Sequence, residues 1–263
     1  MNGTRSHDAL FDKLAGIYLG GSKDFPWYCY AALVFQVNDQ MELVGETWRA
    51  VLAWTQDQEE LLRAARQMRE SLLKASVLVG FPKVHMPLLA FLQAQTNPSQ
   101  GINAMTTLRK HIQASAPEVS NRLDKDPSLR KSIQRPEKDA RGKEFFSHIY
   151  AQHTERVLDH LSIVSGGDLA EFAINAVYGD LMAETTRLSA QWTALIEFLA
   201  CYAVAGSSVV QAKSHMFGSH NLGNGKAELK AAIEICGAIE KDLGVRVDRS
   251  GESWAWLAKM DGW

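Results

Sequence analysis

The sequence has few cysteines, no long apolar run and no excess of charge of either sign. Its three cysteines, Cys29, Cys201 and Cys236, lie far apart and form no CxxC pair. This spacing excludes the disulfide framework of small secreted proteins and predicts buried, reduced thiols. No apolar segment reaches the length of a membrane-spanning helix. The polar start of the chain does not have the pattern of a signal peptide.

The near-neutral charge excludes a second group of functions. Lys and Arg total 28 against 30 Asp and Glu, a formal net charge of −2 over 263 residues. This balance gives no electrostatic reason to expect binding to nucleic acid or to a membrane. The last residues, Asp261-Gly262-Trp263, form no peroxisomal signal. We therefore expect a cytoplasmic protein.

What the sequence does contain is apolar residues at helical spacing along nearly its whole length. No stretch alternates between apolar and polar residues for long enough to predict a strand. The fold class is therefore predicted to be all-α. The expected helices cover roughly 6–18, 26–35, 40–54, 55–78, 83–95, 145–161, 168–177, 188–204, 208–217 and 226–243. Gly179 is expected to interrupt the helix that starts at Asp168, and His220 is expected to lie in the glycine-rich turn that follows 208–217.

The domain organisation follows from a change in composition between Pro117 and Arg141, where 12 of 25 residues are charged. We interpret 117–141 as a charged linker between an N-terminal helical lobe (1–116) and a C-terminal helical lobe (142–244). The two lobes share an order of helices, which indicates a degenerate duplication. The tail, 245–263, holds three tryptophans and is expected to fold back on a core or on a neighbouring subunit.

The stretch from Ser207 to Gly225 carries the candidate chemistry. Gln211, His215 and Ser219 recur every four residues and so share one face of a helix. A histidine with an oriented partner is the commonest acid–base group in enzymes. A structural role stays open for His215. It also stays open for Gln211, because Ser208 and Gln211 match a capping box.

Three further pairs of charged or titratable residues stand out by their spacing. Glu197 lies on an apolar helix 18 residues before His215 and is placed to face it across a helical hairpin, unless it lies at an exposed edge. His215 and His220 are five residues apart, a spacing that does not make a metal-binding face, so we expect no metal. Glu70 and Lys74 are four apart, which predicts an ordinary ion pair on a helix surface.

The segment from Gln211 to Glu228, QAKSHMFGSHNLGNGKAE, resembles the helical hairpin of the carboxymuconolactone decarboxylase and alkylhydroperoxidase D-like superfamily. The weaker part of this resemblance runs from about Pro26 to Ile239 and is similar to long, two-lobed fungal members. It implies an all-α fold in two similar helical lobes, assembly into homo-oligomers and no bound cofactor. It also implies acid–base chemistry on a small carboxylated or lactone substrate.

The sequence departs from the family pattern at two points. The peroxidase members carry a CxxC before the histidine, and the matching positions here are Ser208 and Gln211. The resemblance therefore excludes a thiol peroxidase. The upstream glutamate of the family falls at Ile196, with Glu197 beside it.

We therefore predict a cofactor-independent lyase or isomerase, a decarboxylase or ring-rearranging enzyme with a place in fungal secondary metabolism. His215 would be the general base or acid and Glu197 a second proton carrier. The groups expected to contact the substrate are Gln211, Ser219, Ser208 and Asn221. The expected partners are a small-molecule substrate and further copies of the chain, with no nucleic acid and no membrane. The alternative is a catalytically silent helical binding or scaffold protein.

Overall fold

The structure is a computed structural model that describes residues 7–17, 24–79 and 100–263. In these ranges it consists of helices and connecting segments without a strand, which confirms the all-α prediction. The helix predicted over 83–95 lies outside the described residues. The helices are α1 (Asp8–Gly16), α2 (Trp27–Val37), α3 (Met41–Trp54), α4 (Gln58–Val79), α6 (Gln100–Ser115), α7 (Pro117–Asp124), α8 (Arg135–Tyr150), α9 (Thr154–Ser165), α10 (Asp168–Phe172), η3 (Ala173–Met182), α11 (Ala190–Val204), α12 (Val209–Asn221) and α13 (Lys226–Leu243), with short 3₁₀ turns η2 (Ala151–His153), η4 (Gly206–Ser208) and η5 (Glu252–Gly262).

Helices α2 and α11 lie at the centre of the molecule. Every residue of α2 is buried, as is α11 from Thr193 to Ala203, because both helices are apolar on all sides. They pack against each other, α4 and α13 cover both of them, and α12 lies along α11. One cluster of buried side chains therefore joins residues from both predicted lobes, such as Leu33 and Leu195. The division into two similar lobes is not confirmed.

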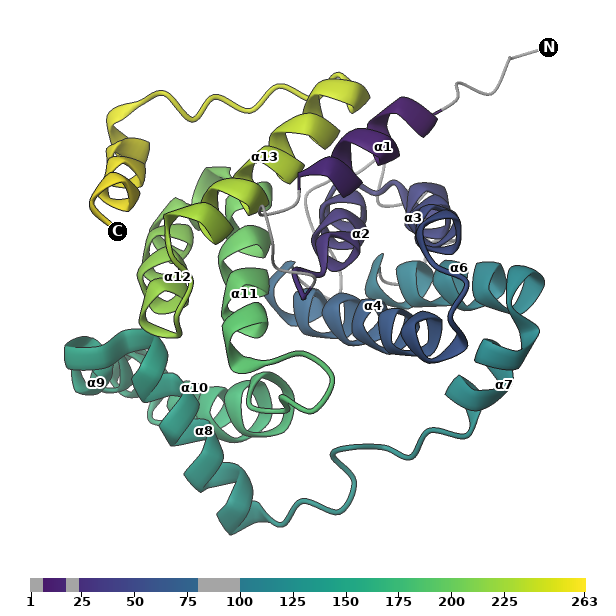
Figure 1. The fold of residues 1–263 in the computed structure, drawn as a ribbon. Coiled ribbons are helices and arrows are strands. Elements are labelled where there is room, and N and C mark those ends of the chain that lie inside the picture. The colour runs from purple at the N-terminus through teal and green to yellow at the C-terminus, as the bar shows by residue number, and fades with distance from the viewer. Residues whose placement is uncertain (1–6, 18–23, 80–99) are drawn as a thin grey trace, which may run out of the picture.

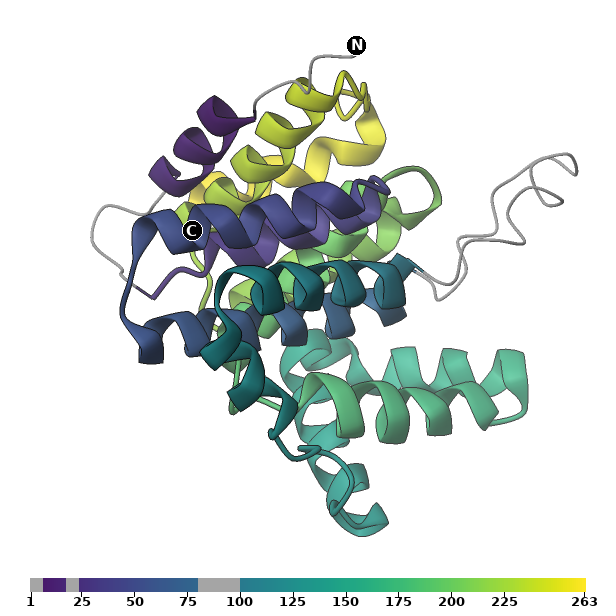
Figure 2. The same ribbon diagram turned by 90° about the vertical axis from the view of Figure 1, so that its right-hand side faces the viewer.

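A smaller layer of α8, α9, α10 and η3 lies below this core in both ribbon views (Figures 1 and 2). Its own apolar cluster includes Phe146 and Tyr178. Helix η3 is wound as a π-helix and continues through Gly179, where the sequence predicted an interruption. Gly179 serves close packing here and does not end the helix. A Cβ on Gly142 or Gly179 would overlap backbone atoms of the facing helix, so the two glycines allow α8 and η3 to pack closely.

The C-terminal tail folds back on the core, as the tryptophan content predicted. Trp254 and Trp256 are buried, and the ring of Trp263 stacks on His220 with centroids 4.0 Å apart. Arg249 fixes the start of the tail because its guanidinium bonds Glu240 and lies over the ring of Tyr202. The tail thus covers the ends of α12 and α13.

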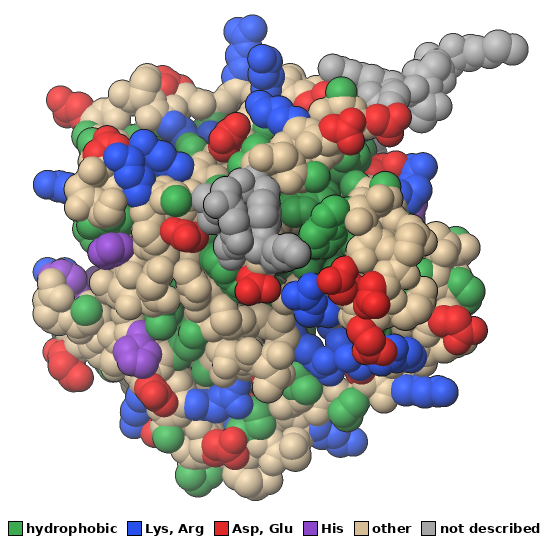
Figure 3. Space-filling view, viewed as in Figure 1, with side chains coloured by type: hydrophobic (Ala, Val, Ile, Leu, Met, Phe, Trp, Pro, Cys, Tyr) green, Lys and Arg blue, Asp and Glu red, His purple; other side chains and the backbone are tan. Residues whose placement is uncertain are grey.

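The burial of the cysteines and the mixed charges on the surface match what the composition predicted. All three cysteines are free and buried. Among the described helices, none has the length and hydropathy of a membrane span. Acidic and basic side chains lie beside one another over the face shown in Figure 3.

Candidate functional site

The hairpin of α11 and α12 brings Glu197 and His215 together. The turn between the helices passes through Ala205, whose φ of 52° reverses the chain. Glu197 Oε2 lies 3.7 Å from His215 Nδ1, and the two side chains are 0% and 6% exposed. This distance is too long for a hydrogen bond. The sequence prediction that these residues face each other thus matches the geometry.

Both members of this pair are short of hydrogen bonds. Neither carboxylate oxygen of Glu197 has a partner among the described residues, and neither does Nδ1 of His215. A buried carboxylate without hydrogen bonds is costly, because nothing replaces the water that solvated it. Such a group is uncommon unless a ligand or a reaction uses it. The pair is therefore the candidate centre of a site.

Two tyrosines that the sequence analysis missed complete the surroundings of His215. The ring of Tyr150 lies 6.2 Å from the imidazole, between centroids, and its hydroxyl is hydrogen-bonded to that of Tyr178. Burial raises the pKa of Tyr150 to about 12 and that of Tyr178 well above its usual value, and Glu197 adds to both shifts. Both phenols therefore stay protonated near neutral pH and remain hydrogen-bond donors.

Cys201 lies one turn after Glu197 on α11 and belongs to the same buried region. Burial, followed by the charge of Glu197, raises the pKa of its thiol to about 12. The thiol therefore stays protonated near neutral pH, and a protonated thiol is a poor nucleophile. The sequence prediction that this cysteine is inert agrees with these surroundings.

Lys74 is the largest departure from the sequence analysis. The predicted surface pair of Glu70 and Lys74 is wrong, because their side chains are 6% and 0% exposed. Lys74 Nζ donates to Glu184 O at 2.6 Å, to Thr193 Oγ1 at 2.7 Å and to Met182 O at 3.3 Å. Glu70 is bonded in turn by Arg130. These acceptors lie more than a hundred residues from Lys74, so no local pattern reveals them.

Burial lowers the pKa of Lys74 to about 8, and the nearby carboxylates of Glu70 and Glu197 oppose that shift. Thr193, which accepts from Lys74, precedes Glu197 by one turn on α11. The ammonium therefore anchors α4 to the helix that carries the candidate carboxylate. In this way α4, from the predicted first lobe, contributes to the surroundings of the pair.

The other predicted site residues have mainly structural contacts. Ser208 Oγ donates to the carbonyl oxygens of Cys201 and Ala205 at the end of α11, so the predicted capping box with Gln211 does not form. Gln211 is exposed. Ser219 is buried and accepts a hydrogen bond of 2.9 Å from Asn224. Asn221 donates to Ile149 O and so ties α12 to α8. A contact of any of them with substrate stays a prediction.

Metal ligation finds no support in the geometry of the described residues, where no three His, Cys, Asp or Glu side chains converge. His220, which the sequence placed in the glycine-rich turn, instead faces Asn224 O and Trp263. The chemistry that the site offers is therefore that of a carboxylate, an imidazole and two phenols.

Comparison with known proteins gives one informative similarity. The chain is 28% identical over 181 residues to Peroxisomal protein 2 of Schizosaccharomyces pombe, an alignment that covers 68% of this chain and 71% of that protein. No family model matches the chain, and no solved structure matches it significantly. The similarity identifies a distant homologue.

Proposed function

We propose that the protein is a cofactor-independent acid–base enzyme whose centre is the pair of Glu197 and His215. The observation that carries the proposal is a buried carboxylate that faces an imidazole at 3.7 Å without hydrogen bonds. An imidazole with a carboxylate on one ring nitrogen is oriented for proton transfer at the other. The resemblance to the carboxymuconolactone decarboxylase and alkylhydroperoxidase D-like superfamily supports the same chemistry.

The roles follow from which atoms face each other. Nδ1 of His215 faces Glu197, so Nε2 is the nitrogen that takes a proton from, or returns it to, an enolisable carbon. The negative charge of Glu197 at 3.7 Å from Nδ1 favours a proton on that nitrogen and stabilises the imidazolium that forms. Tyr150, beside the ring and still protonated, donates a hydrogen bond to the developing enolate oxygen. The substrate class is a small lactone or carboxylated ketone, and the reaction a decarboxylation, an isomerisation or a ring rearrangement.

Assembly and location belong to the same proposal. Four exposed apolar side chains on α9 and α10 support a homo-oligomer, because such patches usually mark interfaces: Ile163, Val164, Leu169 and Phe172. The name of the S. pombe relative assigns that protein to the peroxisome, which makes a peroxisomal location the alternative to the cytoplasm. The resemblance to fungal members supports a role in secondary metabolism.

Proton exchange tests this proposal without knowledge of the physiological product. The protein is incubated in D₂O with a panel of 3-oxo acids and unsaturated carboxylated lactones, and loss of the α-proton signal is followed by NMR. We expect exchange with at least one compound and a rate lower by about 10²–10⁴ for His215→Asn. The control is His148→Asn, because His148 is exposed. Equal rates for wild type and His215→Asn contradict the assignment.

A catalytically silent binding or scaffold protein is the second candidate. The observation in its favour is the slight exposure of His215, at 6% of its side chain. A binding protein of this kind predicts no exchange by the wild type on any compound, together with unchanged oligomer mass for His215→Asn. The exchange experiment therefore separates the two candidates.

A further inference from the structure

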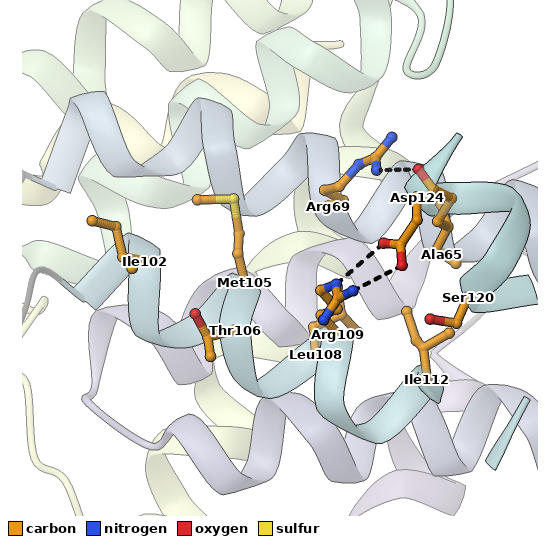
Figure 4. Close-up of a pocket in the computed structure, with 11 residues that line it drawn as sticks. Ala65, Arg69, Ile102, Met105, Thr106, Leu108, Arg109, Ile112, Ser120 and Asp124 are labelled. Atoms are coloured by element: carbon orange, nitrogen blue, oxygen red, sulfur yellow. Dashed lines mark hydrogen bonds and ion pairs between the residues drawn. The ribbon is translucent and has the colours of Figure 1, made fainter. Parts of the chain in front are cut away.

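A cavity of about 250 Å³ lies away from the candidate site, between α4, α6 and α7 (Figure 4). Its walls are mainly apolar, from Ala65 on α4, from Leu123 on α7 and from Ile102, Met105, Leu108 and Ile112 on α6. This volume is far above the about 30 Å³ of one water and just below the roughly 300 Å³ at which drug-sized ligand sites start, so the cavity suits a small molecule. An apolar wall also makes it a poor site for ordered water.

One buried polar group faces this apolar cavity. Ser120 on α7 lines it and is 4% exposed. Among the described residues its hydroxyl has no hydrogen-bond partner, although its backbone N–H bonds Ala116 O. The hydroxyl therefore keeps its donor and acceptor capacity for a ligand oxygen in the cavity.

Charged groups stand at the edge of the cavity. Arg109 bonds Asp124 through Nε and Nη2, at 3.2 and 2.8 Å, and both side chains are about half exposed. Nη1 of Arg109 makes no bond among the described residues, so the guanidinium retains donors for a second anion. Arg69, from α4, lines the same cavity and bonds Leu123 O and Asp126. The edge therefore offers two guanidinium groups over an apolar interior.

We propose that this cavity binds an amphiphilic monocarboxylate, with its apolar chain among the side chains of α6 and its carboxylate on Arg109. An apolar interior of this kind does not suit a polar ligand such as a sugar, because Ser120 is the one buried polar side chain among the lining residues. The carboxylate of Asp124 at the same edge is already bonded by Nε and Nη2 of Arg109, whereas Nη1 of Arg109 is unbonded among the described residues, so the edge favours an anion over an amine. The site is separate from the pair of Glu197 and His215, and neither proposal depends on the other.

Isothermal titration calorimetry of the full chain with decanoate tests the proposal, with 1-decanol as the neutral probe of the same chain length. We expect saturable one-to-one binding of decanoate that is about tenfold tighter than binding of 1-decanol, the size of one charge-assisted hydrogen bond. Arg109→Gln should bring decanoate to the affinity of 1-decanol. Ala65→Leu, which fills the interior, should weaken both ligands.

The control is Arg135→Gln, which breaks another exposed arginine–carboxylate pair, with Glu171 on α10. Its affinity for decanoate should equal that of the wild type. Two results overturn the proposal: equal affinity of the wild type for decanoate and 1-decanol, or an equal loss in Arg109→Gln and Arg135→Gln. Absence of saturable binding of decanoate to the wild type, which needs no variant to fold, also overturns it.

Discussion

Two of the charged centres that the described residues bury against α11, Lys74 and Glu197, differ in how their charges are compensated. The ammonium of Lys74 has three hydrogen-bond acceptors and a carboxylate 3.8 Å away. The carboxylate of Glu197, one turn along the helix from Thr193, accepts no hydrogen bond from the described residues. It faces the imidazole at 3.7 Å and interacts with the charge of Lys74 without contact. A compensated charge holds a structure together, whereas an uncompensated one raises the free energy of the fold. This difference is why we assign a structural role to Lys74 and propose a chemical role for Glu197.

The largest expected effect comes from removing the compensated charge. Lys74→Met leaves Glu184 O, Met182 O and Thr193 Oγ1 buried without their donor, so we expect a loss of roughly 3 kcal/mol in the free energy of unfolding. Denaturant unfolding at pH 7 measures it. Lys143→Met is the matched control, because Lys143 forms an exposed i,i+4 pair with Asp139. The free energy of unfolding of Lys143→Met should stay within about 0.5 kcal/mol of the wild type. Equal losses in the two variants would show that the buried lysine is no more important for stability than an exposed one.

The pH dependence of the same variant gives a smaller effect. The pKa of Lys74 is lowered to about 8 in the folded protein, so between pH 8 and 10.5 the unfolded chain holds a proton that the folded chain has lost. The stability contribution of Lys74 therefore rises with pH in this window.

Unfolding of wild type and Lys74→Met at pH 7.5 and 9.5 tests this sign. The buried cysteines, whose raised pKa values lower stability at high pH, are common to both proteins and cancel in the difference. We expect the gap between the two proteins to widen by about 1–2 kcal/mol. A gap that stays constant would show that Lys74 keeps its proton in this range and would contradict the prediction.

How much the sequence predicted differs between these two centres. Periodicity predicted the all-α class and most of the described helices, because apolar side chains at helical spacing dictate the buried faces. It missed α6 and assigned α7 to the charged linker. The spacing of Glu197 and His215 also predicted that they meet, since a hairpin between adjacent helices is a local event. The Lys74 centre was predicted wrongly as a surface pair. Its partners come from η3, α11 and the segment between them, and tertiary contacts of that kind leave no local signature.

The sequence also could not predict that Tyr150 and Tyr178 belong to the candidate site. Each reads in the sequence as an ordinary core aromatic, on α8 and η3. Only the packing of α8 against α12 brings Tyr150 beside His215, and only the packing of η3 against α8 brings Tyr178 beside Tyr150. The close approach depends on Gly142 and Gly179, and the sequence analysis interpreted Gly179 as a helix breaker.

One variant tests the central claim most directly, because it removes the uncompensated charge and keeps the shape. Glu197→Gln is measured both for its free energy of unfolding and for proton exchange on the panel in D₂O. The account predicts a change in stability within about 1 kcal/mol, because relief of a buried charge offsets the lost attraction to His215. It also predicts a fall in exchange rate of about 10²-fold or more. A stability loss of several kcal/mol with unchanged exchange would show that Glu197 is structural and would contradict the account.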